Sequence, residues 1–457
     1  MFAYHPDSAL ITDLYELTMA QSYWQHDMRA PATFSLYLRD SPQRGYYVAA
    51  GLEPALDFLE CFQFHAGDIE FLANTSKFST AFLDYLGSLR FTGEVRALAE
   101  GTLFFPDEPI LEITAPVIEA QLLETFLINT IGLHTLLSTK AARCVYAAQG
   151  RSLVDFGLRR TQGIDAGMAL ARSSYIAGFD ATSNVLAAKQ FDIPAAGTMA
   201  HSFIQAFGDE KEAFEAYVRT YPRSTILLID TYDTLQGARN AVQVARMMAA
   251  EGNDLVGVRL DSGDMCALSQ EVRRILDDAG MQKVKIFASG GFDEHAVALA
   301  LQKGAAIDAF GVGTKTGVSA DLPYLDMVYK LVRYDSRDVH KLSPGKKTLA
   351  GEKQVFRRTD AKGDYVEDII GVKGEVVDDA SPLLHAVMRE GRIMGRLPAL
   401  DEIRRSFAGR FQKLPDVYKH LSRPARYQVR LSPALEALQE DLEGERYAQK
   451  NRDVQRE

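Results

Sequence analysis

The middle of the chain alternates short apolar runs with longer segments of helical periodicity. The segments at 234–252 and 266–280 place apolar residues at the spacing of an amphipathic helix. Six apolar runs, each ending in a polar or glycine-rich cluster, lie at 152–160, 195–201, 225–233, 255–264, 284–291 and 306–314. This rhythm is typical of repeated β–α units, which close into a barrel or form an open sheet. In either case we expect ligands at the carboxyl ends of the strands.

The two ends of the chain have a different pattern. Residues 8–24 predict an amphipathic helix, with Asp13 and Glu16 as a capping pair and Thr12 as an alternative cap. Short strands are predicted around a turn in 32–50 and in a small antiparallel sheet over 94–116, and residues 117–148 predict a long helix. After residue 330 the pattern becomes hairpin-like and basic, and from about 433 it is helical and heavily charged.

Composition limits the classes of partner. A length of 457 residues suggests two or three domains at ~150 residues each. With 51 Lys and Arg against 61 Asp and Glu, the net charge of -10 argues against nucleic acid or an anionic membrane as the main partner, but a small anionic ligand needs only local cations. Cys61, Cys144 and Cys266 form no CxxC pair. No signal-like start and no run of about 18 apolar residues is present, so we expect a cytoplasmic protein.

Chemically versatile residues collect where the predicted strands end. Glycine turns before a helix present backbone N–H groups to an anion, and on the last strands of a barrel they favour a phosphate site. The alternative for each turn taken alone is a tight connection without a ligand. The clusters are Asp155 with Arg159; Thr198 with His201; Asp230 with Asp233; Arg259, Asp261 and Asp264; Ser289, Gly290 and Gly291; and Gly311, Gly313 and Thr314.

Two of these clusters indicate specific chemistry. In the RLDSGD segment, Asp261 can accept from ribose hydroxyls or hold Mg²⁺, or it can simply pair with Arg259. His201 can act as a base or as a nucleophile toward phosphorus if an acid orients its other ring nitrogen, and Asp230 is the candidate acid. The alternative is a histidine with only a structural role.

Other motifs are absent or ambiguous. The sequence has no HExxH and no GxxxxGK[ST], so we expect neither a dedicated zinc site nor a P-loop. The basic segment 330–358 is either a solvated surface or a lid over a polyphosphate. Its cations are Lys330, Lys341, Lys346, Lys347, Lys353, Arg357 and Arg358.

Nine strings in order resemble the nicotinate phosphoribosyltransferase family of type II phosphoribosyltransferases, from about residue 10 to about 360. They are TDLYELTMAQSYW, FSLYLRDSPQRGYYVAAGLE, STKAAR, DFGLRRTQG, GTMAHSF, LIDTYDTLQGARNA, GVRLDSGD, FASGGFDE and GVGTKTGVS, with VYKLV after the last. The resemblance implies joining of nicotinate to 5-phosphoribosyl 1-diphosphate (PRPP), which gives nicotinate mononucleotide and diphosphate in NAD salvage. ATP hydrolysis would be coupled through a phosphohistidine, with Mg²⁺ as cofactor.

The resemblance also implies a fold and an assembly. The α/β fold would consist of an irregular α/β barrel over 117–330, a smaller α+β sheet domain built from 1–116 and about 331–430, and a charged helix over 431–457. A homodimer would share its active sites between subunits.

Residue roles follow from the same resemblance. His201 would be phosphorylated and would act with Asp230 and Asp261, and no dedicated metal ligands are expected. The residues implied to bind nicotinate are Tyr15 (from the neighbouring subunit), Phe156, Arg159, Thr198 and Arg259. Those implied to bind PRPP are Arg39, Lys140, Asp261, Ser289, Gly290, Gly291, Gly313 and Thr314.

Three competing interpretations remain. Nicotinamide phosphoribosyltransferases have similar barrel motifs, but an Asp stands there where this chain has Met199, which favours the carboxylate substrate. Quinolinate phosphoribosyltransferases share the barrel, but their chain is shorter. A non-catalytic phosphosugar-binding protein on the same scaffold would lack the chemical residues that are present here.

Overall fold

The computed structural model describes residues 8–39, 43–341 and 348–454. The chain divides into two compact units, with Met1–Leu136 and Tyr324–Glu457 in unit 1 and Leu137–Pro323 in unit 2. The longest described helix, α6 (Glu124–Ala148), contributes residues to both units. The domain boundaries expected near 116 and 330 remain a prediction.

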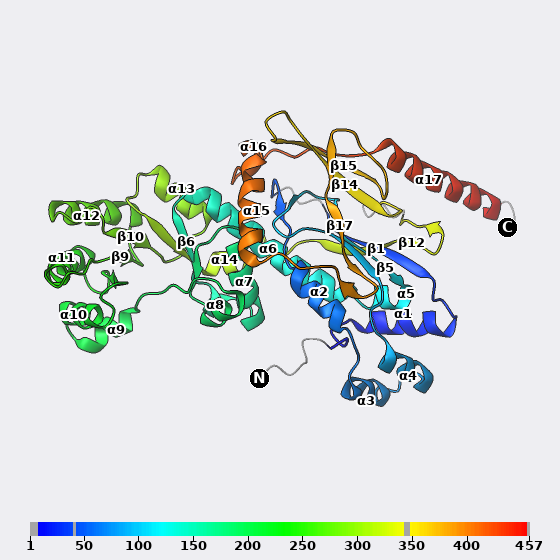
Figure 1. The fold of residues 1–457 in the computed structure, drawn as a ribbon, viewed down its shortest axis with the longest axis horizontal. Coiled ribbons are helices and arrows are strands. Elements are labelled where there is room, and N and C mark those ends of the chain that lie inside the picture. The colour runs from blue at the N-terminus through cyan, green and yellow to red at the C-terminus, as the bar shows by residue number, and fades with distance from the viewer. Residues whose placement is uncertain (1–7, 40–42, 342–347, 455–457) are drawn as a thin grey trace. The chain divides into compact units, whose positions relative to one another are not determined.

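Unit 2 contains a six-stranded parallel sheet (Figure 1). Its strand order, β7-β6-β11-β10-β9-β8, is the order around a barrel that is open between β7 and β8. The expected α/β fold class is therefore confirmed, with a sheet that forms only part of a barrel. The strands are β6 (Ser152–Asp155), β7 (Ala181–Thr182), β8 (Ile226–Leu228), β9 (Gly257–Leu260), β10 (Lys285–Ala288) and β11 (Ala309–Val312).

The prediction of a strand at 195–201 was wrong. Only Ala195 pairs there, in a single bridge to Thr182, and His201 already begins a helix. Pro194 lacks an N–H and Gly197 lacks a side chain to pack, so this segment cannot extend a ladder. The strand beside this segment is β7, which has only two residues and was too short to predict.

Helices follow the strands of unit 2 and are capped by the residues at the strand ends. Asp233 accepts from Gln236 N at 2.7 Å, and Asp264 accepts from Cys266 N at 3.0 Å. These two strand-end carboxylates are therefore helix caps. The helices wholly within the unit are η1 (Leu158–Arg160), α7 (Ile164–Ile176), α8 (Val185–Phe191), α9 (His201–Phe207), α10 (Glu210–Thr220), α11 (Thr234–Ala250), α12 (Met265–Asp278), α13 (Glu294–Gln302) and α14 (Thr314–Gly317).

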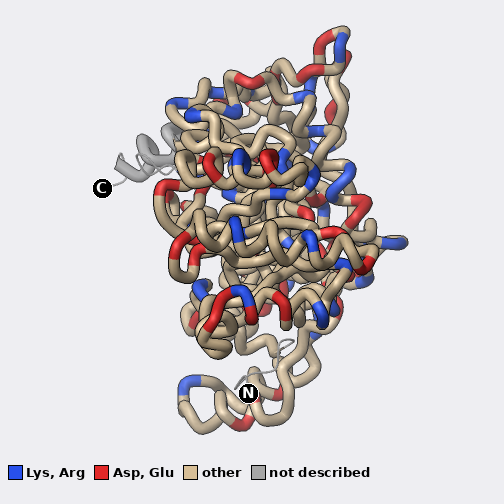
Figure 2. Tube along the Cα trace, turned by 90° about the vertical axis from the view of Figure 1, so that its left-hand side faces the viewer, with Lys and Arg blue, Asp and Glu red and all other residues tan. Residues whose placement is uncertain are grey.

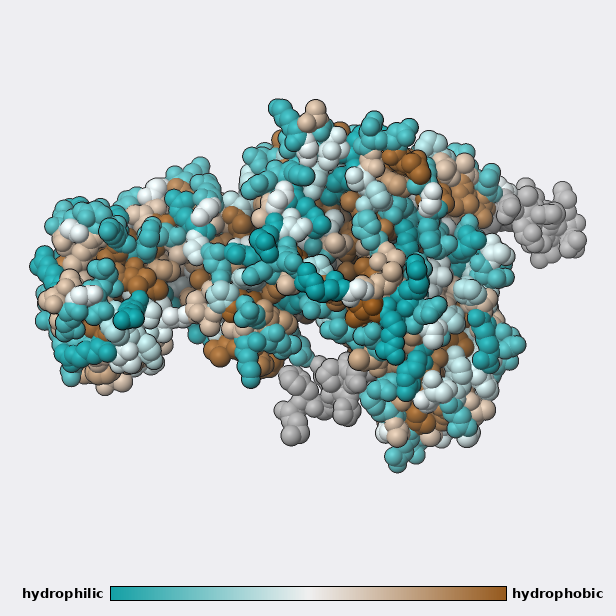
Figure 3. Space-filling view, in the orientation of Figure 1, coloured by the Kyte–Doolittle hydropathy of each residue, from teal (hydrophilic) through white to brown (hydrophobic). Residues whose placement is uncertain are grey.

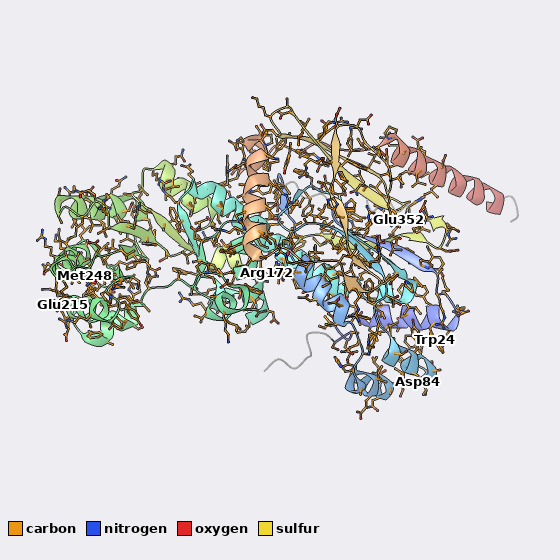
Figure 4. The ribbon with its side chains drawn as sticks, viewed as in Figure 1. Trp24, Asp84, Arg172, Glu215, Met248 and Glu352 are labelled. Carbon is orange, nitrogen blue, oxygen red and sulfur yellow. The ribbon has the colours of Figure 1, made fainter. Side chains whose placement is uncertain are left out.

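Helices such as α10 and α11 bury one face and leave the other in solvent. Figure 4 labels Met248 on α11, which is 2% exposed in the apolar cluster of unit 2. It also labels Glu215 on α10, which pairs with Arg219 at 3.2 Å on the solvated side.

Unit 1 is built around sheets from both ends of the chain, whose strand pairs are antiparallel except for the parallel pair of β15 and β19. The largest has the order β13-β12-β1-β5-β3-β17-β18, and β16-β14-β15-β19 and β2-β4 form two others. The strands are β1 (Pro31–Leu38), β2 (Tyr47–Val48), β3 (Glu94–Leu98), β4 (Leu103–Phe104), β5 (Pro109–Pro116), β12 (Met327–Tyr334), β13 (Arg337–Asp338), β14 (Lys353–Thr359), β15 (Tyr365–Val372), β16 (Ala380–Pro382), β17 (Leu384–Arg389), β18 (Arg392–Ile393) and β19 (Val429–Leu431).

Helices pack on these sheets around aromatic contacts. Trp24, labelled in Figure 4, lies 6.0 Å from Phe82 between ring centroids. The predicted helix over 117–148 divides into two, and Tyr329 Oη donates to the carbonyl of Ala120 at 3.0 Å near the break. The remaining helices are α1 (Leu14–Gln25), α2 (Leu52–Cys61), α3 (Ala66–Asn74), α4 (Thr80–Ser88), α5 (Val117–Gln121), α15 (Leu400–Lys413), α16 (Asp416–Lys419) and α17 (Pro433–Val454).

Charges of both signs alternate along the trace in the view of Figure 2. This mixture agrees with a net charge of -10 spread over the surface rather than gathered in one field. Within the described residues, no helix combines the length and the apolar character that crossing a membrane requires.

Candidate active site

A cavity of about 380 Å³ in unit 2 is lined by residues from five of the six strands. Four residues predicted for the site, Phe156, Thr198, Arg259 and Ser289, line it together. Because β6, β8, β9, β10 and β11 all contribute, the sheet curves around this space. A pocket of this size suits a small ligand.

Arg259, on β9, is the main cation of the cavity. Its Nη2 donates to the carbonyl of Met199 at 2.7 Å, and its Nη1 donates to Ser289 Oγ at 3.4 Å. The buried Nε has no hydrogen-bond partner among the described residues. Burial lowers the pKa of Arg259, while Asp261 and Asp230 act in the opposite direction and Arg159 lowers it further. The arginine therefore has donor capacity left for an anionic ligand.

His201 lies at the first residue of α9, beside the loops that follow β8 and β9. Its Nδ1 is 3.1 Å from Thr231 Oγ1, and its Nε2 is 3.8 Å from Asp261 Oδ2. The side chain is 38% exposed, so a second reactant can reach it. Thr231, which sequence reasoning missed, takes the orienting position that we expected for Asp230.

Asp230 instead holds the loop after β9. Its Oδ2 accepts from Asp261 N at 2.8 Å and from Ser262 Oγ at 2.7 Å. Its Oδ1 is buried without a hydrogen-bond partner among the described residues. Asp261 in turn accepts from Ser289 Oγ. These carboxylate oxygens suit a hard cation such as Mg²⁺.

Close packing requires two of the glycines at the site, Gly290 and Gly311. Gly290 has φ +91°, and a Cβ there would lie 2.1 Å from the carbonyl oxygen of Asp261. A Cβ on Gly311 would lie 2.5 Å from the ring of Phe156. Gly313 precedes α14, and Thr314, the first residue of α14, is exposed. The expected turns are present, and Gly311 makes room for an aromatic ring.

Lys140 and the carboxylates near it form a closed group. Its Nζ lies 2.5 Å from Glu294 Oε2 and 2.7 Å from Asp321 Oδ1, and the side chain is 1% exposed. Glu294, His295 and Asp321 are close enough together to hold a metal ion, but the ammonium of Lys140 already lies between the two carboxylates. This group therefore does not suit a metal, and Lys140 has little capacity left to bind diphosphate.

Two predicted site residues belong to unit 1. Tyr15, in the first turn of α1, is 45% exposed. Burial and the nearby carboxylate of Glu124 raise the pKa of Tyr15. Arg39 pairs with Asp326 at 3.3 Å. Arg159, in unit 2, is exposed in the turn after β6.

Much of the basic segment 330–358 has a structural role. Lys353 is 3% exposed and lies 3.3 Å from Glu112, and Arg357 forms a buried ion pair with Asp368. Lys330 pairs with Glu124 at 3.2 Å, and Arg358 pairs with Glu367 at 2.7 Å. These contacts contradict a lid role for Lys353 and Arg357. Lys341 is exposed, whereas Lys346 and Lys347 lie outside the described residues.

Two further cavity residues were not predicted. Tyr217 and Tyr221, four positions apart on and just after α10, line the cavity with ring centroids 5.0 Å apart. Their helical spacing resembles that of core residues, so the sequence carried no signal that distinguished them.

Comparison with known proteins places this geometry in a family. Models of the nicotinate phosphoribosyltransferase N-terminal domain, family and C-terminal domain match residues 10–132, 151–334 and 377–439. A nicotinate phosphoribosyltransferase of Mycobacterium tuberculosis is 49% identical over 87% of this chain and 85% of its own, and that of Bacillus subtilis is 38% identical over 94% of each. The crystal structure of human nicotinic acid phosphoribosyltransferase is similar with a TM-score of 0.84, at 32% identity over 94% of this chain and 99% of that chain. The chain therefore belongs to the nicotinate phosphoribosyltransferase family.

Proposed function

We propose that this chain transfers the phosphoribosyl group of PRPP to nicotinate, giving nicotinate mononucleotide and diphosphate for NAD biosynthesis. The observation that carries the proposal is the cavity in which an aromatic ring, Phe156, and a buried arginine, Arg259, lie together. A flat aromatic carboxylate matches this pair, because the ring can pack on Phe156 while the carboxylate accepts from the guanidinium.

Each substrate has a proposed place. Thr198, Arg159 and Arg259 surround the nicotinate carboxylate, and Asp261 accepts from the ribose hydroxyls. The 5-phosphate is assigned to the N–H groups and hydroxyls of Ser289, Gly290, Gly291, Gly313 and Thr314. Arg39 is assigned to diphosphate, and Lys140 is left out because two carboxylates already hold it.

Transfer passes through a cationic ribosyl centre with diphosphate as the leaving group, so the protein mainly positions the reactants and neutralises charge. Asp230 and Asp261 offer the carboxylate oxygens that would hold Mg²⁺, and the ion when bound would neutralise charge on the leaving diphosphate.

ATP coupling is proposed to run through His201. A ring nitrogen attacks the γ-phosphorus of ATP, so that an N–P bond forms while the bond to the ADP oxygen breaks. Water later cleaves the N–P bond and releases phosphate. Thr231 supports this role by holding Nδ1 at 3.1 Å. The added charge of about -1.5 to -2 would attract cations around the site.

A homodimer with shared sites is part of the proposal. Its support is a set of exposed apolar residues on α1 and on α7 and α8, where Figure 3 shows apolar surface on unit 2. These are Leu14, Tyr15, Ile164, Val185 and Leu186. Sedimentation equilibrium is expected to give twice the mass of the chain, and a monomer that retains full activity would contradict a shared site.

Transfer of ³²P tests the phosphohistidine. With γ-labelled ATP we expect acid-labile label on the wild-type protein and none on His201→Ala. Equal labelling of both proteins would reject His201 as the acceptor.

A further inference from the structure

The turn after β6 contains a buried carboxylate that the proposed reaction does not use. Asp155, the last residue of β6, is 1% exposed. Its Oδ1 accepts from Gly157 N at 2.7 Å, and its Oδ2 accepts from Thr182 Oγ1 on β7 at 2.7 Å. One side chain thus joins two strands and closes the turn that contains Phe156.

The position of the Phe156 ring depends on that turn. Phe156 N donates to the carbonyl of Val312 at 2.8 Å, and the ring packs on Gly311 at the cavity wall. A Cβ on Gly157 would lie 2.3 Å from Leu170 Cδ2, so the backbone at 157 is tightly enclosed. Phe156 thus lies between two hydrogen bonds, one from its own N–H to Val312 and one from the N–H of Gly157 to Asp155, and the second of these depends on the carboxylate.

Keeping this group ionised is unfavourable for the fold. Burial raises the pKa of Asp155 to about 6, and the hydrogen bonds from Thr182 and Gly157 only partly offset it. Among the described residues no Lys, Arg or His forms an ion pair with it. An amide of the same size would avoid the desolvation of a charge. Buried titratable groups with shifted pKa values occur most often at functional sites, where activity can require a residue that costs stability.

We propose that Asp155 is a positioning residue of the nicotinate site, because its carboxylate holds the Gly157 amide and thereby the Phe156 ring against which nicotinate packs. This inference rests on the proposed function, and in particular on the assignment of Phe156 to nicotinate.

Asp155→Asn tests it with little change in size. An amide oxygen accepts from Gly157 more weakly than a carboxylate, because charge-assisted hydrogen bonds are roughly twice as strong. We expect the KM for nicotinate to rise about fivefold, with kcat and the KM for PRPP within about twofold of wild type. The midpoint of thermal unfolding at pH 8 should stay unchanged or rise. A merely structural residue would instead lose stability and kcat together.

Two further variants serve as control and as independent check. Asp180→Asn makes the same chemical change at the other end of β6, where Asp180 accepts from Ser152 Oγ at 2.6 Å, and should leave the KM unchanged. Thr182→Val removes the second partner of Asp155 and should raise the KM for nicotinate in the same way, while Thr182→Ser should not.

A double-mutant cycle with Phe156→Leu separates the positioning role of Asp155 from the assignment of Phe156 to nicotinate. If Asp155 acts through the ring, Asp155→Asn adds no further increase in KM in the Phe156→Leu background. An unchanged KM in both Asp155→Asn and Thr182→Val, or effects that add in full to that of Phe156→Leu, overturns the positioning role. A Phe156→Leu protein with wild-type KM would instead overturn the proposed nicotinate site.

Discussion

Replacing Arg259 by lysine probes the electrostatics of the cavity. The arginine side chain is 13% exposed, and its guanidinium donates to Met199 O at 2.7 Å, while Nε has no hydrogen-bond partner within the part of the chain that the structure describes. A lysine keeps the positive charge but has no planar fork, so it cannot hold the Met199 carbonyl and a carboxylate in one fixed arrangement.

The expected effect follows from one lost charge-assisted hydrogen bond. Such a bond contributes about 1.5–3 kcal/mol, and because the site is mostly buried we take about 2 kcal/mol. This corresponds to a loss of about 30-fold in kcat/KM for nicotinate. Diphosphate release at saturating PRPP with varied nicotinate measures it.

Arg273→Lys is the matched control. Arg273 bonds to the carbonyls of Val284 at 2.7 Å and Met281 at 2.8 Å, but it does not line the cavity. It should lose stability without a change in the KM for nicotinate. If Arg259→Lys keeps kcat/KM within threefold of wild type, or if only the KM for PRPP changes, the assignment of Arg259 to the nicotinate carboxylate is refuted.

Four other substitutions extend the test. His201→Ala should lose stimulation by ATP while retaining some ATP-independent transfer, and unchanged coupling in steady-state assays would reject its role. Gly290→Ala should raise the KM for PRPP more than tenfold, because its Cβ would lie 2.1 Å from the carbonyl oxygen of Asp261. Gly291→Ala should mainly reduce stability, by about 1 kcal/mol, because φ is +78° and no atom of the described residues lies within 4 Å of the added Cβ. Equal kinetic effects of the two variants would count against this packing argument. Asp155→Asn should gain stability relative to wild type as pH rises from 4 to 7, because the folded pKa near 6 exceeds the ordinary 3.8 and wild type loses about 2 kcal/mol over this window as the buried carboxyl ionises. Urea unfolding at both pH values measures this difference in stability, and a difference that stays constant with pH would be the contrary result.

The parallel sheet was predictable because each of its longer strands can be recognised from a short stretch of sequence. The strands β8 to β11 are mostly apolar, with Arg259 and Lys285 as exceptions, and the clusters after them mark the carboxyl edge of the sheet. The bridge at Ala195 has no such signal, since it depends on a partner strand that is remote in sequence.

Side-chain roles at the strand ends were harder to predict. Asp233 and Asp264 cap helices, whereas Asp230 accepts from the backbone of Asp261, although all of them are aspartates that follow strands. Neighbouring residues in extended chain point in opposite directions, and the sequence did not reveal that Thr231 rather than Asp230 reaches the ring of His201.

Charged residues in strands were misleading for a similar reason. Lys353 looked like a surface cation because its partner is remote along the chain, whereas Arg357 meets its partner, 11 positions away, across the pairing of β14 with β15. Glu112 is 241 positions from Lys353, and Asp368 lies on the adjacent strand β15. Only the paired sheets of unit 1 bring these ions together, so their burial could not be inferred from the basic segment alone.

The most direct test of the central claim is product formation by the purified protein with PRPP and Mg²⁺, supplied with either nicotinate or nicotinamide. With nicotinate we expect nicotinate mononucleotide and diphosphate in equal amounts, and a higher rate when ATP is added; with nicotinamide we expect little product. Equal turnover of nicotinamide, or no diphosphate with either base, would contradict the claim.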